Sequence, residues 1–432
     1  MKKISNLVMM ALLTVGMGLT SCEDILGHWE RPVPVTPTPA SEPENDLSML
    51  DCAGNVRASR WTANCYMVHK AGDYKLPLVY GNAIKDGETN TAAYTGVTGQ
   101  LVTFTNHADA AITAPWIKDN GITVASASLL WQDAEGLVTA VGIEGDYLTL
   151  TVGKDAATQE GNAVIAAKNG DGIIVWSWHI WVTKETFATL TTIATGSHNY
   201  QVTPVNLGWV ATGGDGKQGY NTYYQWGRKD AFIPSDGVTF GSPYADHTVY
   251  DIENGTVTGI TFTSSTDAST DATIADNIKN PTTHYYNSST DGPCNTQYYN
   301  MWDAQNTAED NVTTATVKTV YDPCPPGFCI PTGNLYYYMS GNSGGSNSSG
   351  TWDDTNKGRL WTDNTPNLFF PASGCRNFSS GSLNYVGSYG SYWSASPYGS
   401  SYGRALYFFS SYWYWDYSNR ANGFPVRPVA EE

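Results

Sequence analysis

The residues best suited to ligand recognition gather near the end of the chain, where residues 391–429 read SYWSASPYGSSYGRALYFFSSYWYWDYSNRANGFPVRPV. Tyrosine and tryptophan provide a large contact area with few torsions to freeze, and serine, glycine and asparagine adapt their hydrogen bonds around them, as in antibody loops. The aromatic run at residues 412–415 falls on both faces of any strand, so some of its side chains must be exposed. The segment therefore indicates binding through a surface.

The chain shows no pattern typical of an active site. Paired carboxylates beside aromatic residues, a nucleophile next to a base, and metal-ligand spacings do not stand out. The histidines, among them His69, His107, His179 and His198, form no HxH or HxxxH group, and NGDG at Asn169–Gly172 predicts a hairpin turn. We therefore expect a protein that is not an enzyme and that needs no metal or cofactor. A glycoside hydrolase with carboxylates distant in sequence is the alternative.

The first residues form a targeting signal rather than part of the fold. Lys2 and Lys3 precede an apolar run from Leu7 to Leu19, and LTSC places Cys22 after small residues, as in a bacterial lipoprotein signal. We expect residues 1–21 to be a signal peptide and Cys22 to carry the lipid. An ordinary secretory signal, with Cys22 incidental, is the alternative.

The residues after Cys22 predict where the protein is held. Glu23 and Asp24 resemble the surface-export signal of Bacteroidetes lipoproteins, and the following stretch is rich in proline and poor in large apolar residues. Residues 22–46 are therefore expected to be a lipidated tether. The predicted location is the outer membrane, with the folded part lipid-anchored at the cell surface.

The cysteine count predicts disulfide bonds, and the net charge limits the classes of binding partner. Six cysteines remain after Cys22, an even number that favours disulfides in an oxidising compartment. Cys52 and Cys65 are expected to pair, and the spacing leaves the connectivity of the other four open: Cys294, Cys324, Cys329 and Cys375. The net charge of −17 argues against nucleic acid or anionic lipid as a partner.

Residues 47–187 predict a β-sandwich domain. Short β-branched and aromatic runs are separated by glycine-containing turns, and DYLTLTV alternates with period two, so one face of that strand should be buried. Trp176, Trp178 and Trp181 could stack on carbohydrate, but a strand that is apolar on both faces is more typical of a sandwich core. His179 has no partner at ligand spacing, which favours a structural histidine.

Residues 188–432 differ in composition, because glycine, asparagine, serine and tyrosine rise and strand signals become short and scattered. One long irregular domain explains this part better than several small ones. The predicted fold class is therefore mainly β with an irregular α+β part.

From about Val202 to Val429 this second part resembles a known family, most specifically in its final sixty residues. The motifs DPCPPG, LFFPASG, YWSAS, ALYF and NRANGFPVRPV are similar to the Fibrobacter succinogenes major paralogous domain, a C-type-lectin-like fold of Bacteroidetes surface proteins. Similar tails occur in variable proteins diversified by retroelements and in tip adhesins of type V pili. TANCYMVHKAGDYKLPLVYGNAI and IIVWSWHIWV resemble segments that accompany such tails, which implies a fimbrillin-like first domain.

The resemblance divides the C-terminal residues into a constant framework and a variable surface. It implies a framework of Trp393, Leu406, Phe408, Arg420, Gly423, Phe424, Val426, Arg427 and Val429. It implies ligand contacts by Tyr389, Tyr392, Tyr398, Ser400, Ser401, Tyr402, Arg404, Tyr412, Trp413, Tyr414, Trp415, Tyr417 and Asn419. Pro428 stands where the family often has a cysteine, which places a disulfide to Cys324 in doubt. The calcium-binding triplets of C-type lectins are missing, so binding is expected to be calcium-independent.

These observations predict a cell-surface adhesin, such as a fimbrial or pilus-tip subunit, that binds a host or bacterial surface glycan or protein. Pilus subunits and the outer membrane are the other expected partners. A glycan-capture lipoprotein for polysaccharide uptake is an alternative that the sequence leaves open.

Overall fold

The computed structural model describes residues 45–196, 198–237, 244–265, 273–287, 298–307, 315–341, 346–364, 366–399 and 401–432. All of these residues belong to one compact unit that spans residues 43–432. The predicted signal peptide, nearly all of the tether, Cys22, Cys294 and Ser400 lie outside the described residues.

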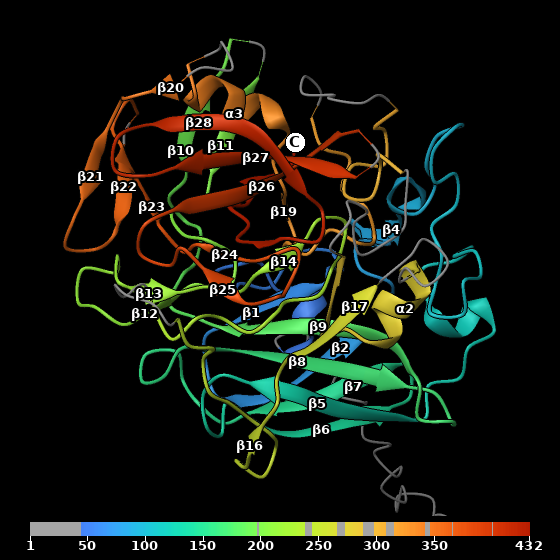
Figure 1. The fold of residues 1–432 in the computed structure, drawn as a ribbon. Helices are drawn as coiled ribbons and strands as arrows, with labels where there is room; N and C mark the ends of the chain where they lie inside the picture. Colours follow the sequence, from blue (N-terminus) through green and yellow to red (C-terminus); the bar gives the residue numbers. More distant parts are fainter. Residues whose placement is uncertain are drawn as a thin grey trace, which may run out of the picture. The chain divides into compact units, whose positions relative to one another are not determined.

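Two sheets form the first part of the chain as a β-sandwich, as predicted. The six-stranded sheet consists, in spatial order, of β1 (Cys65–Val68), β9 (Ile174–Val182), β8 (Gly161–Lys168), β5 (Ser126–Gln132), β15 (Val249–Tyr250) and β16 (Thr256–Val257) (Figure 1). The three-stranded sheet consists of β2 (Gly72–Pro77), β7 (Tyr147–Val152) and β6 (Val138–Glu144). β1 runs parallel to β9, and the pairs β8–β9, β5–β8, β2–β7 and β6–β7 are antiparallel.

The alternation predicted for DYLTLTV is confirmed. Leu148, Leu150 and Val152 of β7 are buried, whereas the residues between them are partly exposed. A strand with this pattern places one side chain in two on the core, and the apolar residues of both sheets belong to one hydrophobic cluster. The NGDG turn is also present, because the N–H of Gly172 donates to the carbonyl of Asn169 between β8 and β9.

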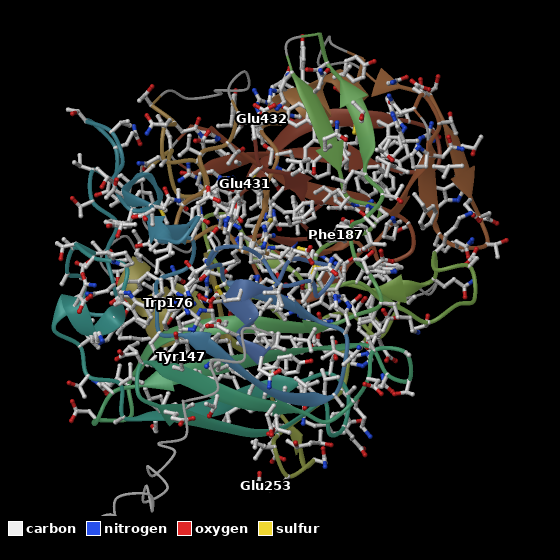
Figure 2. All side chains as sticks on the ribbon, turned by 180° about the vertical axis from the view of Figure 1, so that it is seen from behind. Tyr147, Trp176, Phe187, Glu253, Glu431 and Glu432 are labelled. Carbon is white, nitrogen blue, oxygen red and sulfur yellow. The ribbon has the colours of Figure 1, made fainter. Side chains whose placement is uncertain are left out.

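The tryptophans of β9 are core residues, as predicted. Trp176, Trp178 and Trp181 are at most 1% exposed. Trp176 (Figure 2) packs edge-on against Tyr80, with ring centroids 4.9 Å apart. A carbohydrate could not stack on rings that the chain itself covers on both faces of the strand.

His179 is a buried structural histidine, as predicted. Its Nε2 lies 2.9 Å from Asn162 Oδ1 and its Nδ1 lies 3.3 Å from the hydroxyl of Tyr224. Burial lowers the pKa of His179 to about 3, so the ring stays neutral.

The second part of the chain contains four further sheets of three or four strands. One sheet orders β10 (Thr191–Ala194), β11 (Asn199–Val202), β30 (Val429–Ala430) and β19 (Phe328–Cys329). Another orders β14 (Tyr224–Gln225), β29 (Gly423–Phe424), β24 (Cys375–Arg376) and β25 (Leu383–Asn384). A third orders β20 (Ser346–Asn347), β28 (Trp413–Asn419), β27 (Tyr402–Phe408) and β26 (Gly390–Tyr398). The last orders β21 (Thr351–Asp353), β22 (Gly358–Trp361) and β23 (Leu368–Pro371).

Short strand pairs and helices complete the described elements. The pairs are β3 (Ile84–Lys85) with β4 (Glu88–Thr89), β12 (Val210–Ala211) with β13 (Gly219–Tyr220), and β17 (Thr261–Ser265) with β18 (Thr283–Asn287). The helices are α2 (Ile274–Lys279), α3 (Gly333–Met339), and the 3₁₀ turns η2 (Leu47–Met49), η3 (Thr91–Ala93) and η4 (Ile117–Asn120). The structure therefore confirms a mainly β fold with an irregular α+β part.

The two predicted domains share structure. β15 and β16 come from the second part of the chain but extend the sheet of the first, where Tyr250 pairs with Gln132. One hydrophobic cluster also contains residues of both parts, from Leu47 to Val426. Within the second part, β11 and β19 both pair with β30, so its first strands lie beside its last. The division at residue 187 stays a prediction.

The cysteines differ from the prediction. All five described cysteines are free thiols, so the expected bond between Cys52 and Cys65 is not formed in this structure. Cys52 instead donates through Sγ to the carbonyl of Pro326, 3.6 Å away. Burial raises the pKa of Cys52 to about 12 and that of Cys375 to about 12. Proximity in sequence alone predicted the pair, whereas in the structure the thiol of Cys52 is directed to the main chain at Pro326.

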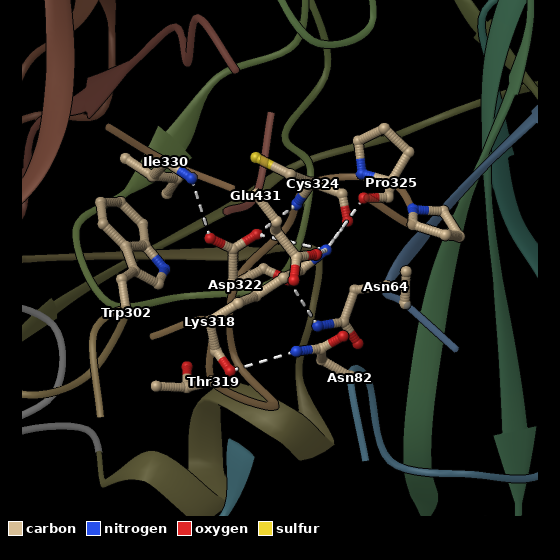
Figure 3. A network of polar contacts seen from close by, with 12 residues as sticks. Asn64, Asn82, Trp302, Lys318, Thr319, Asp322, Cys324, Pro325, Ile330 and Glu431 are labelled. Carbon is tan, nitrogen blue, oxygen red and sulfur yellow. Dashed lines mark hydrogen bonds and ion pairs between the residues drawn. The ribbon is translucent and has the colours of Figure 1, made fainter. Parts of the chain in front are cut away.

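A buried network around Lys318 joins distant segments (Figure 3). The ammonium of Lys318 donates to the carbonyls of Cys324 and Pro325, each at 2.9 Å. The carboxylates of Asp322 and Glu431 lie 3.9 and 3.7 Å from the same nitrogen. Burial alone would lower the pKa of Lys318, but these two carboxylates raise it above its ordinary value.

Two asparagines of the first part of the chain donate hydrogen bonds to main-chain carbonyls of the segment that carries Lys318. Asn64 donates to the carbonyls of Val320 and Asp322 at 2.7 and 2.8 Å, and its own oxygen accepts from the indole of Trp176 at 3.0 Å. Asn82 donates to the carbonyl of Lys318 at 3.2 Å (Figure 3). The core of the sandwich is thereby hydrogen-bonded to the segment that leads into β19.

We expect Lys318→Met to destabilise the protein strongly, because it leaves the carboxylate of Asp322 buried without its cation and removes one of the two cations beside Glu431. The loss of one partner of a buried ion pair typically costs about 3 to 5 kcal/mol. Chemical denaturation would measure the free energy of unfolding. Lys118→Met is the matched control, since Lys118 pairs with Asp146 at an exposed site and should change stability little. Equal effects of the two substitutions would contradict the role assigned to the network.

Candidate ligand-binding surface

The strands β26, β27 and β28 carry most of the residues predicted to contact ligand, and their register sorts these residues onto two faces. Leu406 of β27 lies opposite Tyr392 of β26 and Trp415 of β28, and Arg404 lies opposite Tyr417. Because side chains alternate along a strand, all five of these residues share one face of the sheet. Figure 1 shows the three strands side by side, with α3 next to them.

Half of this face is covered and forms a core. Leu406, Phe408, Trp413 and Tyr392 are all fully buried, in one cluster with Leu335 and Met339 of α3, Trp361 of β22, and Leu368 and Phe370 of β23. The indole of Trp413 donates to the carbonyl of Ser349 at 2.8 Å. The hydroxyl of Tyr392 donates to the carbonyl of Pro371 at 2.7 Å.

The prediction that Trp413 and Tyr392 contact ligand is therefore wrong for this structure. Both side chains are 0% exposed, because α3, β22 and β23 cover the part of the sheet on which they lie. The composition of the segment could not reveal this cover, which comes from residues 333–371. Ser401 and Asn419 are also buried, at 8% and 7% exposure, and Asn419 Oδ1 accepts from the N–H of Ala421.

The other half of the same face is partly exposed and carries the guanidinium of Arg404 among aromatic rings. The guanidinium of Arg404 lies 4.0 Å from the ring centre of Tyr398 and 4.0 Å from that of Trp415. Tyr417, which is 44% exposed, stacks on Tyr398 with centroids 4.4 Å apart and meets Tyr402 edge-on at 5.0 Å. We call these five residues the cation-aromatic surface: Tyr398, Tyr402, Arg404, Trp415 and Tyr417.

The opposite face carries a separate group of tyrosines. Tyr414 stacks on Tyr407, with centroids 5.1 Å apart, and its hydroxyl lies 2.6 Å from that of Tyr389. Tyr412 packs on Phe409, which in turn stacks on Tyr389. Burial raises the pKa of Tyr414, and the hydrogen bond with Tyr389 raises it further. The single predicted surface is therefore divided, with Tyr389, Tyr412 and Tyr414 on one face and the cation-aromatic surface on the other.

Sequence reasoning missed two tyrosines that border these groups. Tyr337 of α3 meets Trp415 edge-on at 5.0 Å, at the boundary between the covered and uncovered halves. Tyr385, 56% exposed, packs beside Tyr389. Tyr337 lies far from the C-terminal segment in sequence, and no periodic signal connects the two.

The predicted framework residues are buried, in agreement with their assigned role. The buried set is Trp393, Leu406, Phe408, Arg420, Gly423, Phe424, Val426, Arg427 and Val429. Trp393 stacks on Phe424 with centroids 4.3 Å apart, on the side of the sheet away from Leu406. Arg427 donates to Asn206 and to the carbonyls of Thr203, Pro204 and Phe369.

Arg420 and Trp226 support the turn between β26 and β27, which leads into the cation-aromatic surface. Arg420 donates to the carbonyls of Tyr402 and Gly399, each at 3.1 Å, and its guanidinium lies 4.1 Å from the ring centre of Trp226. Trp226 also packs on Gly403, where a side-chain Cβ would stand only 2.5 Å from the indole. A glycine is therefore required beside Arg404 for the indole to approach the strand.

A polar cavity of about 610 Å³ lies elsewhere in the fold and contains two buried carboxylates. Asp133 accepts from the N–H and the amide of Asn162, at 2.6 and 2.8 Å, and burial raises its pKa to about 7. Glu160 accepts from the hydroxyl of Thr183 and the N–H of Lys184. Carboxylates that accept this many hydrogen bonds from the chain are typical of structural positions. Among the described residues, no group of three or more histidines, cysteines or acids is placed to hold a metal ion.

One comparison with known proteins found a match. The model of a family described as a domain of unknown function, DUF8237, matches residues 339–429. This range begins at the last residue of α3 and ends at β30, so it contains both faces of the sheet β20–β28–β27–β26. The searches of curated proteins and of solved structures found no match.

The two neighbouring tryptophans of β28 should respond differently to truncation. Trp413→Ala should cost about 3 to 5 kcal/mol of stability, because it removes a fully buried ring and leaves a cavity. Trp415→Ala should cost less, because Trp415 is partly exposed at the edge of the same cluster. Denaturant titration of both variants measures the difference, and equal losses would contradict the division of the face into covered and uncovered halves.

Proposed function

We propose that this protein is a cell-surface adhesin that binds a glycan or protein through the cation-aromatic surface of a C-type-lectin-like domain. The observation that carries the proposal is the uncovered half of the sheet face. There, Tyr398, Arg404, Trp415 and Tyr417 stand partly or largely exposed, whereas the covered half of the same face is buried at Tyr392, Leu406, Phe408 and Trp413. Aromatic and arginine side chains are those that dominate binding energy at protein interfaces.

The framework beneath this surface supports the proposal, because a binding surface loses less entropy on binding when its residues are already held in place. Arg420 holds the carbonyls of Gly399 and Tyr402, and Trp226 fills the space below Gly403. Substitutions on the surface would therefore change binding without disturbing the strands that present it.

We also propose that lipid on Cys22 holds the protein at the outer face of the cell. LTSC and the acidic residues that follow it support this location. Among the described residues, no helix is long and apolar enough to cross a membrane.

The binding role is tested by probing glycan and protein arrays with the full chain. Trp415→Ala and Tyr417→Ala should each weaken binding of the captured ligand by about 2 kcal/mol, as expected for hot-spot residues. Tyr385→Ala is the matched control, since Tyr385 is an exposed tyrosine of the other group and should leave binding unchanged. Binding that is insensitive to Trp415→Ala and Tyr417→Ala would refute the proposed site.

The location is tested with Cys22→Ser, which removes the thiol that would be acylated. The variant should leave the membrane fraction, whereas the unchanged chain should stay in it. Protease treatment of intact cells should degrade the unchanged chain. If the chain survives this treatment while it stays in membranes, surface exposure is excluded and the anchor is retained.

A further inference from the structure

We propose that Asn169 is a site of spontaneous covalent modification, where the side-chain amide is lost through a cyclic imide formed with the main-chain nitrogen of Gly170. The two residues lie in the hairpin turn between β8 and β9, where Asn169 is partly exposed and Gly170 is exposed. The modified residue is an aspartyl or an isoaspartyl group. This site belongs to the sandwich and is separate in sequence from the surface proposed to bind ligand.

The reaction requires only the chain and water. The nitrogen of Gly170 loses its proton to water and bonds to Cγ of Asn169. The Cγ–Nδ2 bond then breaks, and Nδ2 takes up a proton and leaves as ammonia. Water opens the imide at either of its carbonyl carbons, which yields an aspartyl residue or an isoaspartyl residue whose main chain runs through Cγ. Glycine after asparagine favours this route, because it has no side chain to hinder the approach.

Both nitrogens that take part in the reaction are free of hydrogen bonds to the protein. In the part of the chain that the structure describes, neither Nδ2 of Asn169 nor the N–H of Gly170 has a hydrogen-bond partner. Gly170 is also open in space, since a Cβ at this position would meet no atom beyond its chain neighbours within 4 Å. The attacking nitrogen therefore breaks no hydrogen bond of the protein when it loses its proton.

The side-chain carbonyl of Asn169, by contrast, is held and polarised. Its Oδ1 accepts from the N–H of Asp171 at 3.1 Å and from the N–H of Ile173 at 2.9 Å. Negative charge develops on this oxygen when a nucleophile adds to Cγ, and two main-chain donors aimed at it stabilise that charge, as an oxyanion hole does. They also hold the side chain in one orientation. The turn therefore activates the carbon that Gly170 attacks.

The chain contains three other Asn-Gly pairs, and the fold restrains each of them: Asn120–Gly121, Asn254–Gly255 and Asn422–Gly423. At the first pair, Nδ2 of Asn120 donates to two main-chain carbonyls, each at 2.8 Å. The N–H of Gly121 donates to the carbonyl of Lys118 at 3.0 Å. Attack by this nitrogen and loss of ammonia would each cost at least one hydrogen bond.

The other two pairs are each restrained at one reacting group. The N–H of Gly255 donates to Oδ1 of Asp251 at 2.7 Å, so the attacking nitrogen is engaged. Asn422 is only 7% exposed, and its Nδ2 donates to the hydroxyl of Ser418 at 2.8 Å. Asn169 therefore belongs to the pair in which the described fold leaves both reacting nitrogens without a hydrogen bond.

The reaction changes the turn in which it occurs. In the isoaspartyl product, the oxygen that accepted from Asp171 and Ile173 is displaced, because the main chain has gained a methylene group. Those two hydrogen bonds support the turn that joins β8 to β9, the strand that carries Trp176. We expect this hairpin to open locally more often after modification, which hydrogen exchange of β8 and β9 would detect.

The test compares the full chain in its folded state with the same chain unfolded in denaturant. Both are incubated at neutral pH and then digested at acidic pH, where the imide forms slowly. Mass spectrometry follows the replacement of amide by acid at each Asn-Gly pair. All pairs should react in the unfolded chain, whereas in the folded chain Asn169 should be converted and Asn120, Asn254 and Asn422 should stay amides. Conversion of Asn169 in the unfolded chain alone would overturn the proposal, and so would faster conversion of another pair in the folded chain.

Gly170→Ala tests the route through the imide. A methyl group hinders the attack, and the position tolerates it, because Gly170 has open space around it and a φ outside the left-handed region. The variant should stay folded and lose most of the conversion at Asn169. Ile173→Ala is the matched control, since it changes an exposed side chain of the same turn but keeps the N–H donor, and it should leave the conversion unchanged. Conversion that persists in Gly170→Ala without an isoaspartyl product would identify direct hydrolysis of the amide and contradict the imide.

Discussion

The described part of the chain depends on the buried ammonium of Lys318. This one cation is the point at which the sandwich, the segment before β19 and the last residues of the chain meet. Asn64 donates to the carbonyl of Val320 and accepts from the indole of Trp176 in the sandwich core. Glu431 pairs with Lys318 and also with Lys85, whose Nζ lies 2.6 Å from its carboxylate. Removing an ion from water is costly unless it is paired and hydrogen-bonded, so each partner is needed once the others are in place. The network therefore favours one arrangement of these three segments over others.

The same arrangement determines which residues of the C-terminal sheet stay exposed. β30 pairs with both β11 and β19, and the segment that follows β19 forms α3. α3 lies over the sheet of β26, β27 and β28 and packs in one cluster with Leu406, Phe408 and Trp413, and its Tyr337 meets Trp415 at the edge of this cluster. The cation-aromatic surface is thus the part of this sheet face that α3 does not cover. Its position is set by packing well outside the strands that carry it.

Local patterns were sufficient to predict several features. Period-two alternation predicted the buried face of β7, and the apolar character of both faces predicted that Trp176, Trp178 and Trp181 belong to the core. Resemblance to a family predicted the framework, and all nine of its residues are buried. In these cases the information lies in neighbouring residues or in a motif.

Features that depend on distant segments could not be predicted in this way. Trp413 and Trp415 are two residues apart and share a face, so alternation cannot distinguish them, yet one is buried and the other partly exposed. The separation of Tyr414 from them follows from alternation, but the division of the predicted surface into two groups required knowing that the run is a strand. The Cys52–Cys65 pair was inferred from spacing alone, which does not determine whether two sulfur atoms meet.

Stacking of Arg404 between two rings gives the exposed aromatic residues a second role besides contact. A guanidinium on a flexible side chain normally loses rotamer freedom when it becomes part of an interface, and this loss weakens binding. Tyr398 and Trp415 restrict Arg404 before any ligand arrives, and Tyr417 holds Tyr398 in turn. Tyr398 would therefore affect binding through the position of Arg404 even where its own ring does not touch the ligand. In a surface built this way, contact area and preorganisation come from the same side chains, so their contributions to affinity cannot be additive.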